Sequence, residues 1–597
     1  MPTTIEVNKQ SVEALLGSGK SKPFVIPEYQ RPYAWTDEQV ETLFEDLWDF
    51  TATSGGTERE SSYFLGSVVS YENEDGEQEI IDGQQRITSL FLLLRAIYTK
   101  LIATPASERT AEANNFIGKI EPTIWRTNKL TGTVDFKNIL LTSRVVNNEG
   151  NEILRSILET GKADEDAKDN YSKNYRHFQE LFDKHSTENP LMVYQFIYAL
   201  LNQAILLPIT ADTQDTALTI FSTLNDRGLP LSDADIFKAK IYNQLALDDK
   251  KAFIDRWKDL DEQSTDANES IQQLFYYNMF YYRALDKDTK TTTPGVRKYY
   301  AANKFERLYK PELLDTLFVI LNLWKVVNKG EELEDEAWSK NIKIRQTLDI
   351  LTSYPNEYWK YPVVIYYVCY RNEENFETRF ARFLNKLLME LMTKYLMIPT
   401  INAVKPDILK LNSAIVASDI PTFEFKTVDM TQLEPYIQNP NRNAVRMLLK
   451  TLAYEHQDDL LPAKWEIEHI FPQKWQTNYF PDEPDATIKE KIEHIGNKLP
   501  FEKKLNIVAG NGYFGKKKKE YIASKIVITK AMGTSDVMDW NLESITKRDI
   551  RVSDEVVKIM NRWNNEYLNI PISEGKMGEP SEEELAQIEK FKKNGWI

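Results

Sequence analysis

The alternation of apolar and polar positions in residues 10–103 predicts an α/β region. Apolar residues recur at helical spacing in some segments and at every second position in others, with turn residues between them. Pro27 and Pro32 interrupt the apolar run that starts at Phe24, so this run is expected to be extended or turning. The expected elements are a helix from Ser11 through Leu16, extended chain at 24–35, a helix from Thr36 to about Phe50, strands at 64–71 and 79–81 joined by a turn at 73–76, and a helix ending near Ala103.

The rest of the chain is predicted to be mostly helical. Residues 104–200 show helical spacing with polar loops, and residues 240–440 carry dense Leu, Phe and Tyr at 271–282 and 361–396. Such stripes are usually core and not a ligand site. A scaffold, a substrate-sensing surface and a dimer interface are all compatible with residues 241–440. The expected fold class is therefore α+β, multidomain and mostly helical.

Length and composition indicate a globular protein of several domains. The chain has 597 residues, of which 42% are hydrophobic and 27% are charged, and this length is too great for one core. No apolar run reaches the roughly 20 residues of a membrane span, and the first 20 residues lack the pattern of a secretory signal. The single cysteine, Cys369, excludes an internal disulfide and a multi-cysteine zinc site. These features favour a cytoplasmic location.

Charge is distributed unevenly along the chain. The net charge of −16 and the pI of about 5.1 argue against a general polyanion-binding surface. Residues 498–530 nevertheless contain nine lysines and two glutamates, including the run Lys516–Lys519. Lys516, Lys517 and Lys519 are therefore candidates to contact DNA phosphates, although a lysine run is more often a solvated helix face.

Residues suited to binding or catalysis concentrate in Ile80–Leu90, where a strand is expected to lead into a helix. Gly83 permits a tight turn or a close backbone approach to a ligand. Asp82 can hold a metal-bound water or a sugar hydroxyl, and Arg86 offers the planar fork that suits phosphate. Thr88 or Ser89 can cap the following helix, whose N-terminus favours anions. The alternative is a polar turn with a solvated arginine, because no Walker-type phosphate loop is present.

An aromatic segment precedes this stretch. Gln30 and Arg31 lie among Tyr29, Tyr33 and Trp35. Aromatic rings around an arginine suit stacking on a base or fixing the guanidinium. The alternative is an aromatic anchor in a hydrophobic core.

Residues 212–238 predict two helices joined by a turn. Apolar positions from Ala217 to Leu224 share one helix face, and Gly228 suits the position just after that helix. Residues 231–238 have the cap and the acids of a helix start. Taken alone, this pattern indicates an ordinary helix–turn–helix.

The most informative constellation lies in the C-terminal part. Trp465–Pro472 is expected to be a strand that contains Glu468 and His469, whose side chains point to opposite faces. One can ligate a metal while the other acts on water, or the backbone can twist to bring both to one phosphate. Asn497 can orient the imidazole, and Asn506 can offer a second oxygen to a hard cation. This order, followed by a lysine-rich helix, is typical of an HNH or ββα-metal arrangement.

Together these motifs resemble the GmrSD family. The N-terminal part carries Ile-Pro-x-Tyr-Gln-Arg-x-Tyr-x-Trp at 26–35, Asp-Gly-Gln-Gln-Arg-x-Thr at 82–88 and Phe-x-x-Leu-Asn-x-Arg-Gly at 221–228. The C-terminal part carries Glu-His-Ile-x-Pro at 468–472, Gly-Asn at 496–497 and Leu-Asn at 505–506. One departure is Lys498, where the family usually has leucine and where Leu499 can shift to fill the place.

The resemblance implies an N-terminal domain over residues 1–240 with a fold similar to ParB and sulfiredoxin. In this family, and in SspE-like and BrxU-like proteins, that domain is associated with binding and hydrolysis of a nucleoside triphosphate. Asp82 and Arg86 are then expected to be catalytic as well. The residues that the resemblance assigns to the nucleotide are Gln30, Arg31, Asp82, Gly83, Gln84, Gln85, Arg86, Thr88, Asn225, Arg227, Asp235 and Lys238.

The resemblance also implies an HNH nuclease domain over residues 441–566, after a helical region at 241–440 and before a tail at 567–597. In it, His469 is expected to be the general base, Glu468 and Asn506 to hold one Mg²⁺ or Mn²⁺ ion, and Asn497 to orient His469.

The function implied is a modification-dependent type IV restriction endonuclease of anti-phage defence. It is regulated by a nucleoside triphosphate and cuts DNA by metal-assisted phosphodiester hydrolysis. The expected partner is double-stranded DNA, either modified phage DNA or phosphorothioated DNA. No membrane is expected to be involved. A homodimer is compatible with this function.

A second class of function is left open by the sequence. The protein could be a nucleotide-switched DNA-binding and sensing module whose nuclease domain is vestigial or only nicks DNA weakly. The intact set of Glu468, His469 and Asn506 argues against that alternative. A housekeeping nucleoside triphosphatase would not account for the C-terminal constellation.

Overall fold

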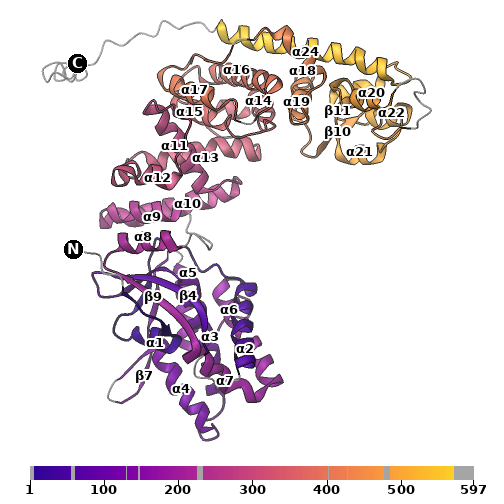
Figure 1. Cartoon of the computed structure of the whole chain (residues 1–597). Coiled ribbons are helices and arrows are strands. Elements are labelled where there is room, and N and C mark those ends of the chain that lie inside the picture. Colours follow the sequence, from indigo (N-terminus) through magenta and orange to yellow (C-terminus); the bar gives the residue numbers. More distant parts are fainter. Residues whose placement is uncertain are drawn as a thin grey trace, which may run out of the picture. The chain divides into compact units, whose positions relative to one another are not determined.

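Two compact units make up the chain. Unit 1 comprises Met1–Asp261 and Tyr300–Tyr309, and unit 2 comprises Glu262–Tyr299 and Lys310–Ile597. Figure 1 shows them in a computed structural model, with the sequence running from indigo to yellow. The structure describes residues 6–54, 61–128, 131–145, 148–224, 233–400, 402–426, 428–475 and 484–569.

Unit 1 contains a mixed sheet. Its strands are β1 (Glu6–Val7), β2 (Gln10–Ser11), β3 (Phe24–Ile26), β4 (Tyr63–Glu72), β5 (Gln78–Asp82), β8 (Leu141–Ser143) and β9 (Ala204–Ala211). Their order is β1–β9–β4–β5–β3–β8, and β2 also pairs with β9. β4 runs antiparallel to β5 and parallel to β9, whereas β3 is parallel to both β5 and β8. The carboxyl end of β5 therefore leads directly into the predicted Asp82–Arg86 stretch.

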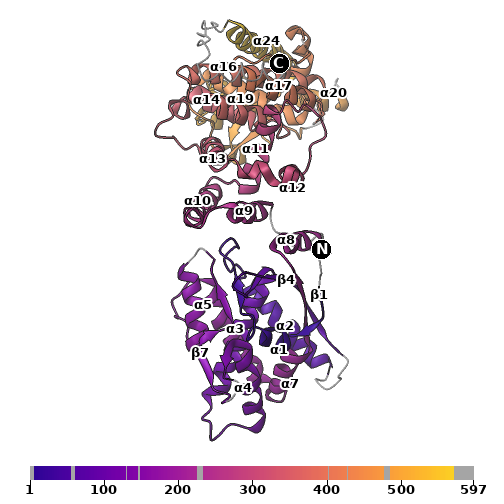
Figure 2. The ribbon, with the colours of Figure 1, turned by 90° about the vertical axis from the view of Figure 1, so that its left-hand side faces the viewer.

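Helices surround this sheet. They are α1 (Val12–Ser18), α2 (Asp37–Ser54), α3 (Gln84–Ala103), α4 (Ala111–Ile124), α5 (Asn148–Thr160), α6 (Asn170–Glu188), η1 (Pro190–Met192), α7 (Val193–Tyr198), η2 (Ala199–Gln203), α8 (Gln214–Leu224) and α9 (Asp233–Gln244). α3 lies near the middle of unit 1 in Figure 2 and contacts α4, α5 and α6, and its apolar residues share one core with strand residues such as Val68 and Ile80. Its segment Leu90–Leu94 is fully buried, as expected for a helix that is apolar all round.

The structure confirms the elements predicted for the first 103 residues. α1 begins directly after Ser11, whose hydroxyl accepts a hydrogen bond from the Ala14 amide at 3.2 Å. Differences occur farther along. Residues 104–200 were predicted to be helical with polar loops, but they also contain the hairpin of β6 (Trp125–Thr127) and β7 (Val134–Ile139) as well as β8.

The middle of the chain is helical, as predicted. Its elements are α10 (Leu247–Asp266), α11 (Ile271–Leu285), α12 (Val296–Ala301), η3 (Ala302–Tyr309), α13 (Leu313–Lys329), η4 (Ala337–Lys340), α14 (Ile342–Leu351), α15 (Lys360–Tyr370), α16 (Phe376–Met397), α17 (Lys405–Ala417), η5 (Met430–Leu433), α18 (Glu434–Gln438), η6 (Arg442–Ala444) and α19 (Val445–His456). Aromatic packing fills the core of these helices, as where Tyr366 stacks on Phe383 with ring centroids 4.1 Å apart. None of the described helices combines the length and apolar character that a membrane crossing requires.

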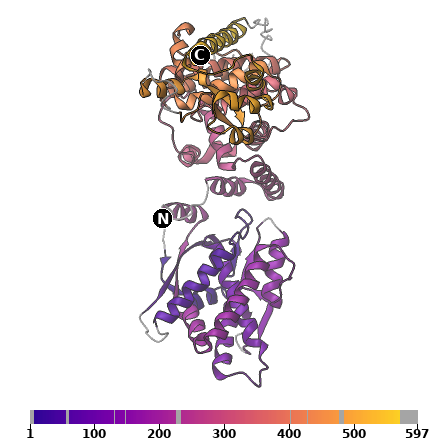
Figure 3. The same cartoon turned by 90° about the vertical axis from the view of Figure 1, so that its right-hand side faces the viewer.

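The C-terminal elements of unit 2 form a β–β–α arrangement. They are β10 (Trp465–His469), α20 (Asp485–Ile492), η7 (Ile495–Asn497), β11 (Lys498–Glu502), α21 (Lys503–Ala509), α22 (Phe514–Ile522), α23 (Val527–Thr534) and α24 (Leu542–Leu568). β10 pairs antiparallel with β11, so that Glu468 lies opposite Leu499. α21 follows β11 at once and packs on both strands. The long helix α24, drawn in yellow in Figure 3, contacts both α16 and η7.

Candidate functional site

His469 ends strand β10 and is half-buried, with 16% of its side chain exposed. Its Nε2 lies 3.6 Å from Oε1 of Glu493 and 3.5 Å from Nε2 of Gln473. Burial lowers the pKa of the imidazole to about 4, although the nearby Glu493 carboxylate opposes this shift. The ring is therefore neutral near pH 7 and can accept a proton.

Glu468 points to the other face of β10 and is buried. Its Oε1 accepts a hydrogen bond from the Tyr521 hydroxyl at 2.6 Å and forms an ion pair with Lys517 Nζ at 2.7 Å. Lys517 also donates to the backbone carbonyl of His469. Among the described residues, both side-chain contacts fall on Oε1, which leaves Oε2 to bind another group. The carboxylate is thus held in place on one side only.

The lysine run divides between buried and exposed positions. Lys517 is 1% exposed and engaged with Glu468, so the prediction that it contacts DNA is corrected: it belongs to the interior of the candidate site. Lys518 donates to the carbonyls of Ser535 and Val537. Lys516 and Lys519 are exposed. Consecutive helical residues step by about 100°, which separates these four side chains onto different faces.

Asn497 is completely buried. Its side chain accepts a hydrogen bond from the Phe471 amide at 2.7 Å and donates to the carbonyls of Phe471 at 3.0 Å and Ile492 at 3.1 Å. The side-chain amide of Asn497 is therefore bonded to main-chain groups and not to the imidazole of His469. Asn497 holds the backbone just after β10, and its side chain does not make the predicted direct contact with His469.

Asn506 lies on α21 beside the same strand. Its Nδ2 donates to Oε2 of Glu466 at 3.2 Å, which leaves the amide oxygen available. Glu466 and Glu468 are two residues apart on β10, so their side chains emerge on one face about 7 Å apart along the strand. Glu466 was not singled out from the sequence, although strand alternation from Glu468 would have indicated it.

These donors fit a hard divalent cation. Glu468 offers Oε2 and Asn506 offers its amide oxygen, and oxygen ligands are those that Mg²⁺ prefers. The described residues contain no cluster of three or more His, Cys, Asp or Glu side chains suited to a metal. A metal here would thus rely on few protein ligands, as is usual for Mg²⁺, which keeps several waters.

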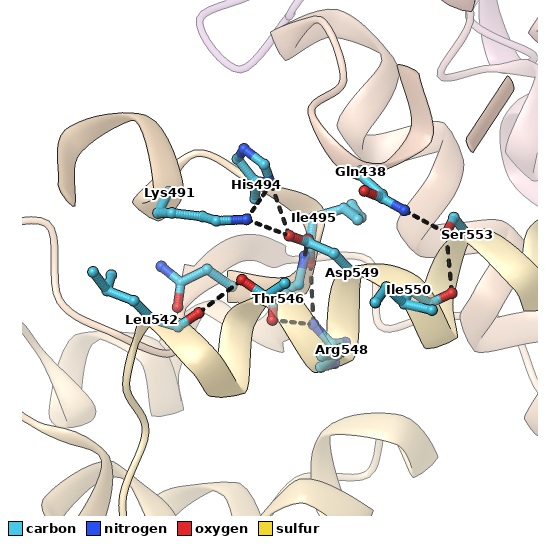
Figure 4. A network of polar contacts seen from close by, with 12 residues as sticks. Gln438, Lys491, His494, Ile495, Leu542, Thr546, Arg548, Asp549, Ile550 and Ser553 are labelled. Carbon is cyan, nitrogen blue, oxygen red and sulfur yellow. Dashed lines mark hydrogen bonds and ion pairs between the residues drawn. The ribbon is translucent and has the colours of Figure 1, made fainter. Parts of the chain in front are cut away.

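Two residues of α24 hold the turn before β11 (Figure 4). Nη1 of Arg548 donates to the carbonyls of Ile495, Gly496 and Lys498 at 3.1, 2.9 and 2.8 Å. Asp549 accepts a hydrogen bond from the Gly496 amide at 2.7 Å. Any side chain at Gly496 would force α24 or the turn to move, because its Cβ would lie 2.3 Å from the carbonyl oxygen of Ile545.

Lys498, the departure from the family pattern, leaves the hairpin intact. It is buried, and its Nζ forms an ion pair with Glu493 at 2.8 Å. Glu493 in turn faces His469. The lysine therefore reaches the surroundings of the imidazole where leucine could not. The neighbouring Leu499 is fully buried in the core of this region.

In unit 1, two predicted ligand residues join the aromatic segment to the Ile80–Leu90 stretch. Oε1 of Gln85 accepts hydrogen bonds from the amides of Ala34 at 2.7 Å and Trp35 at 3.2 Å, and its Nε2 donates to Pro32 at 3.1 Å. Nε2 of Gln30 donates to the Ile81 carbonyl at 3.1 Å. The structure thus brings the motifs at 26–35 and 82–88 together. The side-chain amides of Gln30 and Gln85 are both bonded to main-chain groups.

Other predicted residues gather where β5 becomes α3. Gly83 has a φ of +88° and precedes the first residue of α3, a conformation that favours glycine. Gln84 is buried, and its Oε1 holds no hydrogen bond within the described part of the chain. Burial raises the pKa of Asp82, while the charges of Arg86 and Arg31 oppose the shift. These two cations therefore lie near the carboxylate at the start of the helix.

Arg86 lines an open hollow of about 300 Å³ together with Trp35, Tyr63 and Phe64. Its Nη1 donates to the Ser67 carbonyl at 3.0 Å. The guanidinium lies over Gly66, where a Cβ would come within 2.9 Å of it. Phe64 is 63% exposed, which leaves an aromatic surface beside a cation.

The remaining predicted residues lie elsewhere. Thr88 and Ser89 lie inside α3, whose N-terminal cap is Gly83, so the prediction that one of them caps the helix is wrong. Asn225 and Arg227 fall outside the described residues. On α9, burial lowers the pKa of Lys238, and the charges of Asp235 and Asp261 oppose that shift, so its charged neighbours are these two acids.

Comparison with known families gives two matches. Residues 12–242 match the family model described as GmrSD restriction endonuclease, N-terminal domain. Residues 429–552 match the model described as GmrSD restriction endonucleases, C-terminal domain. No curated protein matched the chain. The first match contains the Asp82–Arg86 stretch and the second contains the β10–β11–α21 arrangement.

Proposed function

Because this chain belongs to the GmrSD restriction endonuclease family, we propose that it is a modification-dependent type IV enzyme of anti-phage defence. It cuts double-stranded DNA in the cytoplasm under the control of a nucleoside triphosphate. The observation that carries this proposal is the grouping of His469, Glu468 and Asn506 on one β–β–α arrangement. Digestion of modified and plain DNA by the full chain is the experiment that tests it.

His469 is the proposed general base. Its Nε2 takes a proton from a water molecule as that water attacks the phosphorus of the scissile phosphodiester. Glu493 lies 3.6 Å from this nitrogen and stabilises the imidazolium that results. Asn497 holds the backbone of Phe471 just after His469, and Arg548 holds the turn before the paired strand β11.

Glu468 and Asn506 would hold the divalent cation, Mg²⁺ or Mn²⁺, through the oxygens that their protein contacts leave available. When bound, such a cation stabilises negative charge on the phosphate and on the leaving oxygen. Lys517 and Tyr521 fix the position of the Glu468 carboxylate. Removing either partner would free that carboxylate to rotate away.

Lys516 and Lys519 are the proposed DNA contacts within the lysine run. Both are exposed, whereas Lys517 and Lys518 are used inside the protein. Phosphate contacts add affinity without reading sequence. Discrimination between modified and plain DNA is therefore assigned to other residues.

Replacing Lys516 and Lys519 together by Gln is expected to weaken DNA binding and to reduce the slope of log K against log [salt] by about two units. The matched control replaces the exposed Lys329 and Lys558 by Gln. Binding of one DNA duplex is measured across a salt series for both double variants. An unchanged slope in the first variant would mean that DNA enters elsewhere.

For unit 1 we propose that the start of α3 binds and hydrolyses a nucleoside triphosphate. Arg31 and Arg86 supply positive charge, Gly83 and the backbone amides of the helix start face the phosphates, and Gln84 offers a buried carbonyl oxygen with no protein partner. The aromatic hollow beside Arg86 suits a base. Gln30, Gln85 and Thr88 shape this site from behind, and Asn225, Arg227 and Lys238 stay candidates to complete it.

Arg86→Ala is expected to weaken nucleoside triphosphate binding about tenfold or more, because a charge-assisted contact to phosphate is lost. Asp82→Ala is expected to reduce hydrolysis. Arg126→Ala, an exposed arginine of the same unit, is the control. Calorimetry with each triphosphate and phosphate release measure the two effects. If neither Arg86→Ala nor Asp82→Ala changes nucleotide binding or phosphate release, the Ile80–Leu90 stretch is only a structural turn.

A further inference from the structure

A cavity in unit 2 is lined in part by Arg548, the residue that binds the turn before β11. It has a volume of about 830 Å³ and is walled by α19, α23 and α24. Its apolar walls include Leu452, Met532 and Val552, and its cationic groups include Arg548 and Arg551. This size lies within the range of sites for small organic ligands, about 300–1,000 Å³.

Arg548 has donors to spare in this cavity. The residue is only 6% exposed, and its hydrogen bonds to Ile495, Gly496 and Lys498 all come from Nη1. Figure 4 shows the guanidinium beneath α24 at this turn. Nε and Nη2 hold no hydrogen bond to the described residues. A planar guanidinium anchored on one side and open on the other suits an oxyanion.

The charges of Asp549 and Glu555 favour the charged form of Arg548, but among the described residues neither carboxylate forms an ion pair with Arg548 or Arg551. Arg551 is exposed, and within the described ranges no ion pair joins it to a carboxylate. Asp549 is occupied by His494 at 2.7 Å and Lys491 at 3.3 Å. Glu555 is bonded to His456 at 2.5 Å. Two adjacent guanidinium groups without a bonded carboxylate favour an anion from outside.

One neutral donor adds to this pattern. Trp540 lines the cavity and is 5% exposed, and its Nε1 has no hydrogen-bond partner among the described residues. A buried indole N–H usually has a partner. An acceptor on a ligand that reaches this part of the cavity would supply one.

We infer that this cavity binds a nucleoside phosphate. The base lies against the apolar walls with an acceptor toward Trp540, and the phosphate lies against Arg548 and Arg551. The source is either a free nucleotide or a nucleotide of a DNA strand, since both present the same chemistry. This inference is independent of the nucleotide site proposed at α3, because different residues of a different unit carry it.

The test is calorimetry of the full chain with adenosine 5′-monophosphate, in a background of Arg86→Ala that weakens the site at α3. Adenosine and inorganic phosphate serve as separate probes of the two halves of the cavity. A 5′-phosphorylated single-stranded oligonucleotide represents the DNA source. Ala531→Trp fills the cavity from an exposed position on α23, so it blocks the ligand without disturbing the core.

Arg551→Gln is expected to weaken binding of the monophosphate about tenfold, and Ala531→Trp to abolish it. Lys558→Gln, an exposed lysine of the same helix outside this cavity, is expected to leave it unchanged. If only the oligonucleotide binds and shows this pattern, the ligand is a nucleotide of DNA. If neither probe responds to Arg551→Gln and Ala531→Trp, the inference is wrong.

Discussion

His469→Ala is expected to reduce DNA cleavage about 10²–10⁴-fold, the usual cost of losing a general base. The imidazole is half-buried at the end of β10 and neutral near pH 7, so it can take the proton that water must lose. The variant keeps its fold because the loss removes few core contacts. Nucleoside triphosphate binding is unchanged, since the proposed residues belong to unit 1.

The measurement is the rate of DNA cleavage in Mg²⁺ or Mn²⁺, with thermal unfolding as a check of the fold. His177→Ala, on α6 of unit 1, controls for the loss of a histidine. Cleavage by the His469 variant at the wild-type rate would remove this residue from the mechanism. Loss of cleavage with a large fall in unfolding temperature would make its role structural.

Lys517→Met is expected to have the largest effect on stability of any single change in the lysine run. It leaves the Glu468 carboxylate buried without its cation, and breaking one side of a buried pair costs about 3–5 kcal/mol. Burial lowers the pKa of Lys517, and the Glu468 charge opposes the shift. Cleavage is expected to fall with stability, because Glu468 loses its fixed position.

Lys519→Met is the matched control, since Lys519 is exposed on the same helix. Urea unfolding of the two variants is compared, and Lys519→Met is expected to change the free energy of unfolding by less than about 0.5 kcal/mol. Equal stability of the two variants would contradict the buried pair. In that case Lys517 would return to the set of DNA contacts.

Much of the N-terminal fold could be predicted because local signals and tertiary contacts agree there. Ser11 caps a helix, Gly83 takes a positive φ, and the apolar run after Arg86 forms a buried helix. The turn at Asn73–Gly76 follows from its residue types and joins β4 to β5. These features depend on residues within a few positions of one another.

Other strands could not be predicted in this way. β9 contains Pro208, which is unfavourable in most strands, yet it pairs with β4 over its whole length. That pairing joins residues about 140 positions apart, so no local pattern indicates it. β6 and β7 form a hairpin within a region whose overall spacing is helical.

In the candidate site, the sequence indicated residue types and order but not all partners. Strand alternation predicts that Glu468 and His469 point to opposite faces, and their contacts differ: Glu468 contacts Lys517 and Tyr521, whereas His469 lies near Glu493. The burial of Lys517 depends on how α22 packs on β10, which a run of four lysines does not reveal. Asn497 looked suited to the imidazole, whereas the turn at 495–498 needs its amide for main chain. Arg548 and Asp549 serve that turn from 50 or so residues away.

The central claim is that unit 2 is a nuclease whose action depends on modified DNA and on a nucleoside triphosphate. The most direct test is digestion of glucosylated, methylated, phosphorothioated and plain DNA by the full chain, in Mg²⁺ or Mn²⁺, with and without each triphosphate. The account predicts cleavage of at least one modified DNA, absent from plain DNA and changed by a triphosphate. No cleavage of any substrate, or equal cleavage of all with no effect of any triphosphate, would contradict it.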